Sequence, residues 1–240
     1  MSTKTVFING GSRGIGAAMV RLFSENGYRV AFSYHQSEPE ALLLEKECGA
    51  VGVRADSSNV SEIEKAVSFV LERFGGVDIL VNCAAVSFFG LYTDIKEDEW
   101  EKLLAVNLKA PERYIRLFLP SMIFKKQGRI INISSMWGQV GASCEVHYSL
   151  TKAALIGLTK ALAKELGPSG ITVNAIAPGL IDTDMNAHLS EKEKAALCEE
   201  TPLMRVGTPN DVAECALFLA GKGGDFITGQ VLCPNGGYVI

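Results

Sequence analysis

Short runs rich in Val and Ile alternate along the chain with longer runs of helical period, and this order strongly constrains the fold. Most short runs are continuously apolar, which is typical of strands covered on both faces of a parallel sheet. We expect strands at Thr5–Asn9, Arg29–Tyr34, Val51–Arg54, Ile79–Asn82, Arg129–Ser134, Thr172–Ala177 and Gln230–Cys233. Helices are expected at Gly14–Asn26, Glu38–Cys48, Ser61–Phe74, Trp100–Lys125, Tyr148–Leu166 and Asn210–Ala220. The pattern predicts an α/β, doubly wound fold with a seven-stranded, mostly parallel sheet flanked by helices on both faces.

The size of the chain favours one domain. Its 240 residues, 48% hydrophobic and 21% charged, can bury a large core, and no stretch has the composition of a linker. We therefore expect a single domain over residues 1–240. A sheet of this kind binds ligands beyond the carboxyl ends of its strands, so functional residues are expected directly after each strand.

Charge and cysteine usage exclude several classes of partner. The net charge is -4 and Lys and Arg form no run, which argues against a surface for nucleic acid or for an anionic membrane. No apolar stretch approaches the roughly 18 residues of a membrane span, and residues 1–4 lead into a strand pattern rather than a secretion signal. The six cysteines lack C-x-x-C spacing, which indicates reduced thiols rather than disulfides. We expect a cytoplasmic protein that binds a small soluble partner and no metal ion.

A glycine-rich turn follows the first expected strand. Residues 10–16 read GGSRGIG and lead into a helix. Glycines let the backbone turn sharply toward a pyrophosphate, and the free amides and dipole of a helix N-terminus attract the anion. A tight strand-to-helix connection would also be glycine-rich, but the position in the first βα unit favours a dinucleotide site. The candidate contacts in this turn are Gly10, Ser12, Arg13, Gly14, Ile15 and Gly16.

Tyr148 and Lys152 are four residues apart in an expected helix, so their side chains share one face. A free tyrosine has a pKa of about 10. An ammonium about 4 Å away favours the phenolate by roughly 4 kcal/mol at an effective dielectric constant of about 20, or about three pKa units at most. The pair predicts a phenol whose pKa Lys152 lowers toward neutral and which exchanges a proton with a carbonyl oxygen. Taken alone, it is also what one turn of an ordinary helix contains.

Two further residues add to this pair. Ser135 ends an apolar strand run thirteen positions before Tyr148, where its hydroxyl would hold a substrate carbonyl. Asn107 interrupts an expected helix, and because Asn is a poor helix former it needs a reason such as holding a water behind Lys152. With the Gly-x-x-x-Gly-x-Gly turn, these residues resemble the short-chain dehydrogenase/reductase family over nearly the whole chain. The resemblance implies a Rossmann-like fold and the catalytic set Asn107, Ser135, Tyr148 and Lys152.

The same resemblance implies further cofactor contacts. Asp56 stands where the family has an acid near the adenine, and Pro178-Gly179 follows the sixth strand. The stretch 82–85 reads NCAA where the family has Asn-Asn-Ala-Gly, and Asn9 replaces the usual Thr before the glycine turn. The remaining implied contacts are Tyr34, Asp56, Ser57, Asn82, Ala84, Tyr148, Lys152, Pro178, Gly179, Ile181 and Thr183.

The end of the second strand bears on the choice of cofactor. Sites for NAD usually place Asp or Glu there, to bind the ribose 2′-hydroxyl and repel a 2′-phosphate. Residues 33–36 read SYHQ and contain no acid, while Arg13 in the glycine turn offers a guanidinium to a phosphate. The sequence therefore favours NADP(H). If Arg13 contacts only solvent, NAD is the alternative cofactor.

Several stretches resemble the bacterial 3-oxoacyl-acyl-carrier-protein reductases within this family. They are residues 171–179, 183–185 and 202–207. The resemblance implies NADP(H)-dependent reduction of a small-molecule or carrier-bound ketone to a secondary alcohol, as in fatty acid biosynthesis. It also implies basic docking residues near the mouth of the site, where Lys126 keeps a cation and Ser169 does not. Enoyl reductases of this fold separate Tyr and Lys by more residues, so the spacing here indicates carbonyl chemistry.

Residues 136–147 resemble instead a sister group of reductases that act on a 5-aminopentanone group on elongation factor P. A primary amine on the substrate needs a counter-charge, which Glu145 would supply. Alternatively, Glu145 is a carboxylate at a helix start and Trp137 is a packing residue. The candidate substrate contacts are Ser135, Trp137, Glu145 and Tyr148.

The segment Thr183–Thr201 has the composition of a substrate lid, with His188 as a further candidate contact, although a fixed surface helix would look the same. The family resemblance implies a homotetramer assembled through the helices that carry Asn107 and Tyr148, with residues 236–240 near another contact. A cofactor-binding sensor or structural subunit without turnover is the alternative from another class. The presence of all four catalytic residues argues against it.

Overall fold

Seven parallel strands lie at the centre of the computed structural model, which describes residues 3–187 and 189–240. Their order across the sheet is β3-β2-β1-β4-β5-β6-β7, and every pairing is parallel. The strands are β1 (Thr5–Asn9), β2 (Arg29–Tyr34), β3 (Val51–Arg54), β4 (Ile79–Asn82), β5 (Gly128–Ile133), β6 (Ile171–Ile176) and β7 (Val231–Leu232). The expected doubly wound α/β fold is confirmed, and the bounds of β1 to β4 are those expected from the apolar runs.

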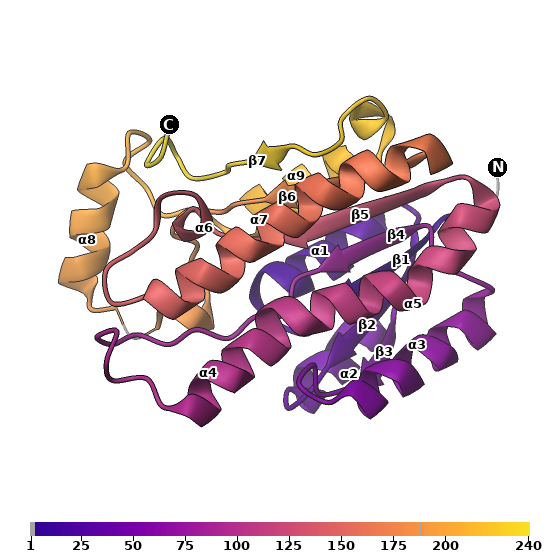
Figure 1. Ribbon diagram of the computed structural model, residues 1–240, viewed down its shortest axis with the longest axis horizontal. Helices are drawn as coiled ribbons and strands as arrows, with labels where there is room; N and C mark the ends of the chain where they lie inside the picture. Colours follow the sequence, from indigo (N-terminus) through magenta and orange to yellow (C-terminus); the bar gives the residue numbers. More distant parts are fainter. Residues whose placement is uncertain (1–2, 188) are drawn as a thin grey trace.

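Helices cover both faces of the sheet, as Figure 1 shows. One face packs against α1 (Gly14–Glu25), α2 (Glu38–Cys48) and α9 (Pro209–Ala220). The other packs against α3 (Val60–Phe74), α5 (Ala110–Lys125) and α7 (Val146–Leu166). The alternation within β1 fits this arrangement, since Val6 and Ile8 belong to the first core and Phe7 to the second. Burial on both faces explains why the strand runs are continuously apolar.

The expected helix Trp100–Lys125 is wrong in one respect, because it is interrupted. The structure has α4 (Glu97–Leu104), a π-helical segment at Ala105–Lys109, and then α5. The interruption surrounds Asn107, which is fully buried and hydrogen-bonded. Insertions of this kind turn a side chain away from the regular helical path and are frequent at functional sites.

The strands β5 and β6 each begin and end one residue earlier than expected, so Ser134 and Ala177 follow the strands. The strand β7 keeps only two residues of the expected Gln230–Cys233. A short helix, α6 (Trp137–Val140), was not expected from the sequence. It packs directly on α7, where a Cβ added to Gly138 would stand 2.8 Å from the backbone carbon of Lys152.

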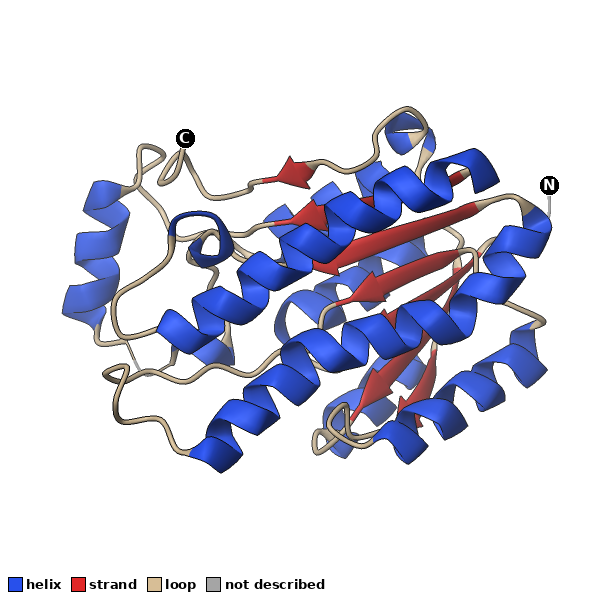
Figure 2. Ribbon diagram, in the orientation of Figure 1, coloured by secondary structure: helices blue, strands red, loops and turns tan. Residues whose placement is uncertain are grey.

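All strands run toward the same side of the molecule, where α6, the short helix α8 (Glu191–Glu200) and the C-terminus lie (Figure 2). This is the edge at which functional residues are expected in a doubly wound fold. Among the described residues, no helix is long and apolar enough to cross a membrane, and no His, Cys, Asp and Glu side chains form a group that could hold a metal ion. All six cysteines are free thiols.

Candidate active site

Tyr148 and Lys152 project from the first two turns of α7 into the edge of the sheet. Both are buried, with relative exposures of 8% and 2%. The Lys152 Nζ lies 5.5 Å from the ring centroid of Tyr148 and donates a hydrogen bond of 2.9 Å to the carbonyl oxygen of Ile133, the last residue of β5. The one-turn spacing therefore does bring the ammonium beside the phenol, as the sequence predicts.

The two serines after β5 have different partners. Ser134 Oγ donates to the carbonyl oxygen of Lys152 at 2.9 Å, so it is used in joining β5 to α7. Ser135 Oγ accepts a hydrogen bond of 3.2 Å from the Trp137 backbone N–H and lies beside the phenol of Tyr148. This geometry favours Ser135 over Ser134 as the hydroxyl that acts together with Tyr148.

Asn107 joins the loop after β4 to α7. Its Oδ1 accepts from the Val86 backbone N–H at 2.9 Å, and its Nδ2 donates to the Val86 carbonyl at 2.8 Å and to Thr151 Oγ1 at 3.1 Å. Thr151 directly precedes Lys152 and was not singled out in the sequence. Because both amide hydrogens of Asn107 are used, the side chain fixes the relative position of two elements of the site. The water expected behind Lys152 stays a prediction.

The pKa values of the pair correct the expectation from the sequence. Burial raises the pKa of Tyr148 well above its ordinary value, the charge of Glu145 raises it further, and the Ser135 hydroxyl opposes both effects. Burial lowers the pKa of Lys152 to about 8. The predicted lowering of the Tyr148 pKa is therefore wrong for the protein alone, because desolvation of the phenolate is the largest influence on it. Tyr148 keeps its proton at neutral pH.

A cavity of about 490 Å³ opens beside these residues. It extends from Ile15 at the start of α1 to Tyr238 near the C-terminus, a size suited to a small ligand. The predicted site residues that line it are Ile15, Ser135, Trp137, Glu145, Tyr148, Lys152, Pro178, Gly179, Ile181 and Thr183. Lining residues that the sequence did not single out for the site include Cys83, Ala85, Phe89, Leu197 and Tyr238.

The glycine turn has the properties of a pyrophosphate site. The N-cap residue of α1, Arg13, makes no side-chain capping bond in the described part of the chain, so the amides of the first turn are available to an anion. Gly14 has φ +51°, and a Cβ there would stand 3.3 Å from Cγ2 of Thr183 and narrow the space between the turn and the residues after β6. Ala84 lies against this turn, with its N–H donating to the Asn9 carbonyl at 2.9 Å. These residues fit a dinucleotide pyrophosphate.

Side chains at the carboxyl ends of β1 and β2 and just after β3 form a polar cluster beside the turn. The Asn9 Oδ1 accepts hydrogen bonds from the hydroxyls of Ser33 and Ser57, each at 3.0 Å. Asp56 accepts from the Ser58 backbone N–H and hydroxyl, each at 2.8 Å. The Asn9 side chain thus bonds two serine hydroxyls, whereas a bond to the backbone is expected of a Thr substitute. Asp56 and Ser57 lie at the edge expected to face the adenosine.

Three other predicted cofactor residues, Ser12, Tyr34 and Asn82, lie near the ends of β1, β2 and β4. Ser12 Oγ lies 2.7 Å from Ser37 Oγ, and Tyr34 is partly buried at the end of β2. Asn82 Nδ2 donates to Asn132 Oδ1 at 2.8 Å inside the sheet. Asn82 is buried and is absent from the lining of the cavity, so its side chain joins β4 to β5.

Arg13 has a partner that the sequence did not indicate. Its Nη1 donates to Asp184 Oδ2 at 3.2 Å. Asp184 follows Thr183 at the start of the expected lid segment. Arg13 therefore forms an ion pair with the protein itself in this structure, whereas a solvated or phosphate-binding guanidinium was expected.

Aromatic and apolar side chains surround the outer part of the cavity. Trp137 packs edge-to-face on Tyr238, with ring centroids 5.8 Å apart, and the Tyr238 hydroxyl donates to Glu200 at 2.9 Å. Glu145 lines the cavity and is also the residue before the first turn of α7, so both sequence interpretations of it are compatible with its position. Trp137 is likewise a cavity wall and a packing residue.

The segment Thr183–Thr201 contributes to the cavity wall. Met185, Asn186, Leu189 and Leu197 from this segment line the cavity, and α8 lies within it. The candidate contact His188 lies outside the described residues. The segment is thus part of the cavity wall, and its role as a lid stays a prediction.

The whole chain matches known proteins. A family model described as enoyl-(acyl carrier protein) reductase matches residues 10–239. The 3-oxoacyl-(acyl-carrier-protein) reductase FabG of Staphylococcus aureus is 39% identical over 240 residues, which cover 98% of each chain. A short-chain dehydrogenase/reductase variant from Serratia marcescens has 34% identity, a TM-score of 0.91, and coverage of 98% of this chain and 97% of its own. The chain belongs to the short-chain dehydrogenase/reductase family.

Membership in the short-chain dehydrogenase/reductase family confirms the resemblance inferred from the glycine turn and the catalytic set, and makes the chain an oxidoreductase. A further structural relative is a blue fluorescent protein from a metagenomic library, solved in complex with NADPH. It has 36% identity and a TM-score of 0.93, with coverage of 99% of this chain and 98% of its own.

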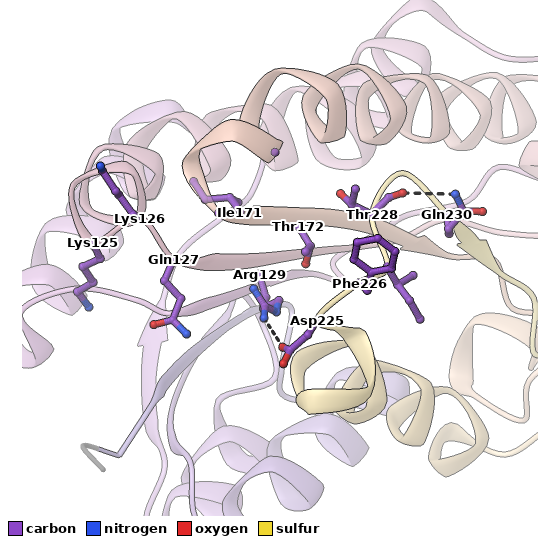
Figure 3. A pocket seen from close by; sticks show the side chains of 13 residues that line it. Lys125, Lys126, Gln127, Arg129, Ile171, Thr172, Asp225, Phe226, Thr228 and Gln230 are labelled. Atoms are coloured by element: carbon purple, nitrogen blue, oxygen red, sulfur yellow. Dashed lines mark hydrogen bonds and ion pairs between the residues drawn. The ribbon is translucent and has the colours of Figure 1, made fainter.

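Lys126 was expected near the mouth of the catalytic site as a carrier-docking cation. Within a single chain of this short-chain dehydrogenase/reductase, that prediction is wrong. Lys126, at the end of α5, lines a second cavity of about 750 Å³ together with Lys125 and Arg129 (Figure 3). This cavity lies around the amino end of β5, whereas the catalytic cavity lies beyond the carboxyl end of that strand. The helix α5 leads away from the site, so its last residues reach the opposite edge of the sheet. Arg129 is bonded there to Asp225 at 2.6 Å.

Proposed function

We propose that this chain uses NADP(H) to reduce a ketone to a secondary alcohol, with a 3-oxoacyl group on a carrier protein as the substrate. The observation that carries the proposal is the pairing of the Ser135 and Tyr148 hydroxyls in a cavity that begins at the glycine turn. The name of the Staphylococcus aureus relative supports the substrate class.

NADP(H) is preferred over NAD(H) in this proposal for two reasons. Residues 33–36 at the end of β2 contain no acid to repel a 2′-phosphate, and Arg13 in the glycine turn offers the bidentate donor that such a phosphate accepts. The NADPH complex of the metagenomic relative is consistent with this choice. The other expected cofactor contacts remain part of the proposal.

The chain's own residues have distinct roles in the proposed reaction, for which NADPH supplies a hydride when bound. Ser135 donates a hydrogen bond to the substrate carbonyl and holds its oxygen next to Tyr148. Tyr148, kept protonated by burial, transfers its proton to that oxygen as negative charge develops. Lys152 stabilises the phenolate that remains, and Asn107 holds α7 and the Val86 loop in position.

Reduction of a carbonyl is favoured over reduction of a carbon–carbon double bond, which the description of the family model names. Tyr148 and Lys152 are one helical turn apart, and Ser135 lies beside the phenol. The Ser135 and Tyr148 hydroxyls can thus act on one oxygen atom, with Lys152 beside the phenol. Such convergence suits a ketone, whose oxygen receives the proton directly.

A second candidate substrate is a ketone that carries a primary amine, such as the 5-aminopentanone group on elongation factor P. Glu145 is the observation that favours it, because it is the one acidic side chain among the described residues that line the cavity. Its negative charge reaches Tyr148, so it would also reach an ammonium group bound nearby.

The two candidates are separated by following NADPH oxidation with an acetoacetyl thioester and with elongation factor P that carries the aminopentanone group. A 3-oxoacyl reductase turns over the thioester efficiently, and Glu145→Gln leaves that rate nearly unchanged. Turnover of the factor alone, lost in Glu145→Gln, would replace the first candidate with the second.

We further infer that copies of the chain assemble into a homotetramer in the cytoplasm and that Thr183–Thr201 closes over the bound substrate. Phe124 at the end of α5 is 88% exposed and Leu150 on α7 is 53% exposed, so both helices carry apolar side chains that an interface would cover. Light scattering of the purified protein should give four times the chain mass, and Leu150→Asp should lower it.

A further inference from the structure

Arg13 and Asp184 connect the glycine turn to the segment Thr183–Thr201. The guanidinium Nη1 donates to the carboxylate Oδ2 at 3.2 Å, although the residues are 171 positions apart in the chain. The two elements also touch nearby, since a Cβ on Gly14 would stand 3.3 Å from Cγ2 of Thr183. The glycine turn and the residues after β6 face each other across a space, and the ion pair bridges one side of that space.

The backbone is fixed on both sides of this ion pair. The Arg13 carbonyl accepts from the Ala17 N–H at 3.1 Å and so belongs to the first turn of α1. On the other side, Ile181 is buried and forms a parallel bridge with Gly207, and its carbonyl accepts from Asn186 Nδ2 at 2.7 Å. Asp184 lies between Ile181 and Asn186 in the chain, so its carboxylate stays within reach of Arg13.

We propose that Asp184 is a specificity-determining residue, which competes with the 2′-phosphate of NADP(H) for Arg13. The inference rests on the proposed function, in which Arg13 binds that phosphate. The Arg13 N–H that bonds Asp184 must be released before it can bond a phosphate oxygen, and the carboxylate also repels the phosphate because both are negative. NADH carries a hydroxyl in place of this phosphate and escapes the competition.

The solvent exposure of Arg13 and Asp184 determines how much the competition should change cofactor affinity. The Arg13 side chain is 59% exposed and that of Asp184 is 76% exposed. Solvent screens ion pairs of this kind, so loss of the competitor should change affinity by only about two- to fivefold. The change is expected only for ligands that carry a 2′-phosphate.

The test compares dissociation constants, measured by calorimetry, for NADPH, NADH, adenosine 2′,5′-bisphosphate and AMP. The variant Asp184→Asn should bind NADPH and the bisphosphate about two- to fivefold more tightly, with NADH and AMP unchanged. Asp182→Asn is the matched control, because Asp182 is also exposed and undergoes the same charge change two positions away, while its N–H bonds the Gly207 carbonyl. It should leave all four constants unchanged.

Two outcomes would overturn the proposal: Asp184→Asn leaves NADPH affinity as it was, or it strengthens NADH binding equally. The variant Arg13→Gln separates this failure from failure of the cofactor assignment. If Arg13→Gln weakens NADPH alone while Asp184→Asn has no effect, the competition is wrong and the assignment stands. If Arg13→Gln weakens NADPH and NADH equally, the assignment fails, and the inference with it.

Discussion

The ammonium of Lys152 bonds the carbonyl oxygen of Ile133 at 2.9 Å, at the point where β5 ends and the catalytic cavity begins. The side chain is almost wholly buried, and burial lowers its pKa to about 8. Among the described residues no carboxylate bonds Lys152, so its charge is kept at the expense of stability. This is the pattern expected of a residue retained for chemistry.

Replacing this lysine should stabilise the protein while abolishing its activity. In Lys152→Met an apolar side chain of similar length removes a buried charge, so the free energy of unfolding at pH 7 should rise by about 1–4 kcal/mol. The folded pKa lies below that of the unfolded chain, so the penalty is full below about pH 8 and disappears as pH rises toward the ordinary lysine value. Denaturant titrations at several pH values measure this gain.

The matched control is Lys160→Met on the same helix, where the side chain is exposed and the change should stay within about 0.5 kcal/mol. A lower stability of Lys152→Met at pH 7, or a gain that persists undiminished at high pH, would contradict this explanation.

The rate of ketone reduction should fall as pH rises through about 8. Lys152 loses its charge in that range, while burial keeps Tyr148 protonated to much higher pH. We expect kcat/KM to decrease about tenfold per pH unit above this point, because the uncharged amine no longer stabilises the phenolate. A profile of kcat/KM from pH 6 to 10 tests this, and a constant value up to pH 10 would count against the role of Lys152.

The close approach of α6 to α7 should make Gly138 intolerant of a side chain. In Gly138→Ala the added methyl group would stand 2.8 Å from the backbone of Lys152 and 2.9 Å from Ser134 Oγ, so α6 must shift and Ser135 with it. We expect kcat to fall by at least tenfold, with little change in NADPH affinity. Gly157→Ala, in open space on α7, should keep full activity and stabilise the helix by about 0.5–1 kcal/mol. Equal kcat values for the two variants would refute the argument.

Much of this architecture could be predicted because it depends on local pattern. Continuous apolar runs gave the bounds of β1 to β4, and the one-turn spacing brought Tyr148 and Lys152 together. What the pattern missed depends on distant partners. The π-helical segment surrounds Asn107, whose bonds reach Val86 and Thr151, and no local periodicity encodes them.

The errors in the electrostatics have the same origin. The pKa expected for Tyr148 depends on the nearness of Lys152 alone, whereas the largest influence in the folded site is burial, which the sequence does not show. Likewise, local sequence predicts a phosphate-binding or solvated Arg13, because its partner Asp184 lies 171 positions away. The sequence identified the participants, whereas their partners required the fold.

The most direct test of the proposed chemistry is the turnover of Tyr148→Phe, which removes one hydroxyl from the site. Single-turnover NADPH oxidation with an acetoacetyl thioester should slow by at least about a thousandfold, because the hydroxyl that transfers its proton to the carbonyl oxygen is removed. NADPH affinity should change far less than turnover, since the glycine turn and the other proposed cofactor contacts remain in Tyr148→Phe. Turnover that survives in Tyr148→Phe at a comparable rate would contradict the account.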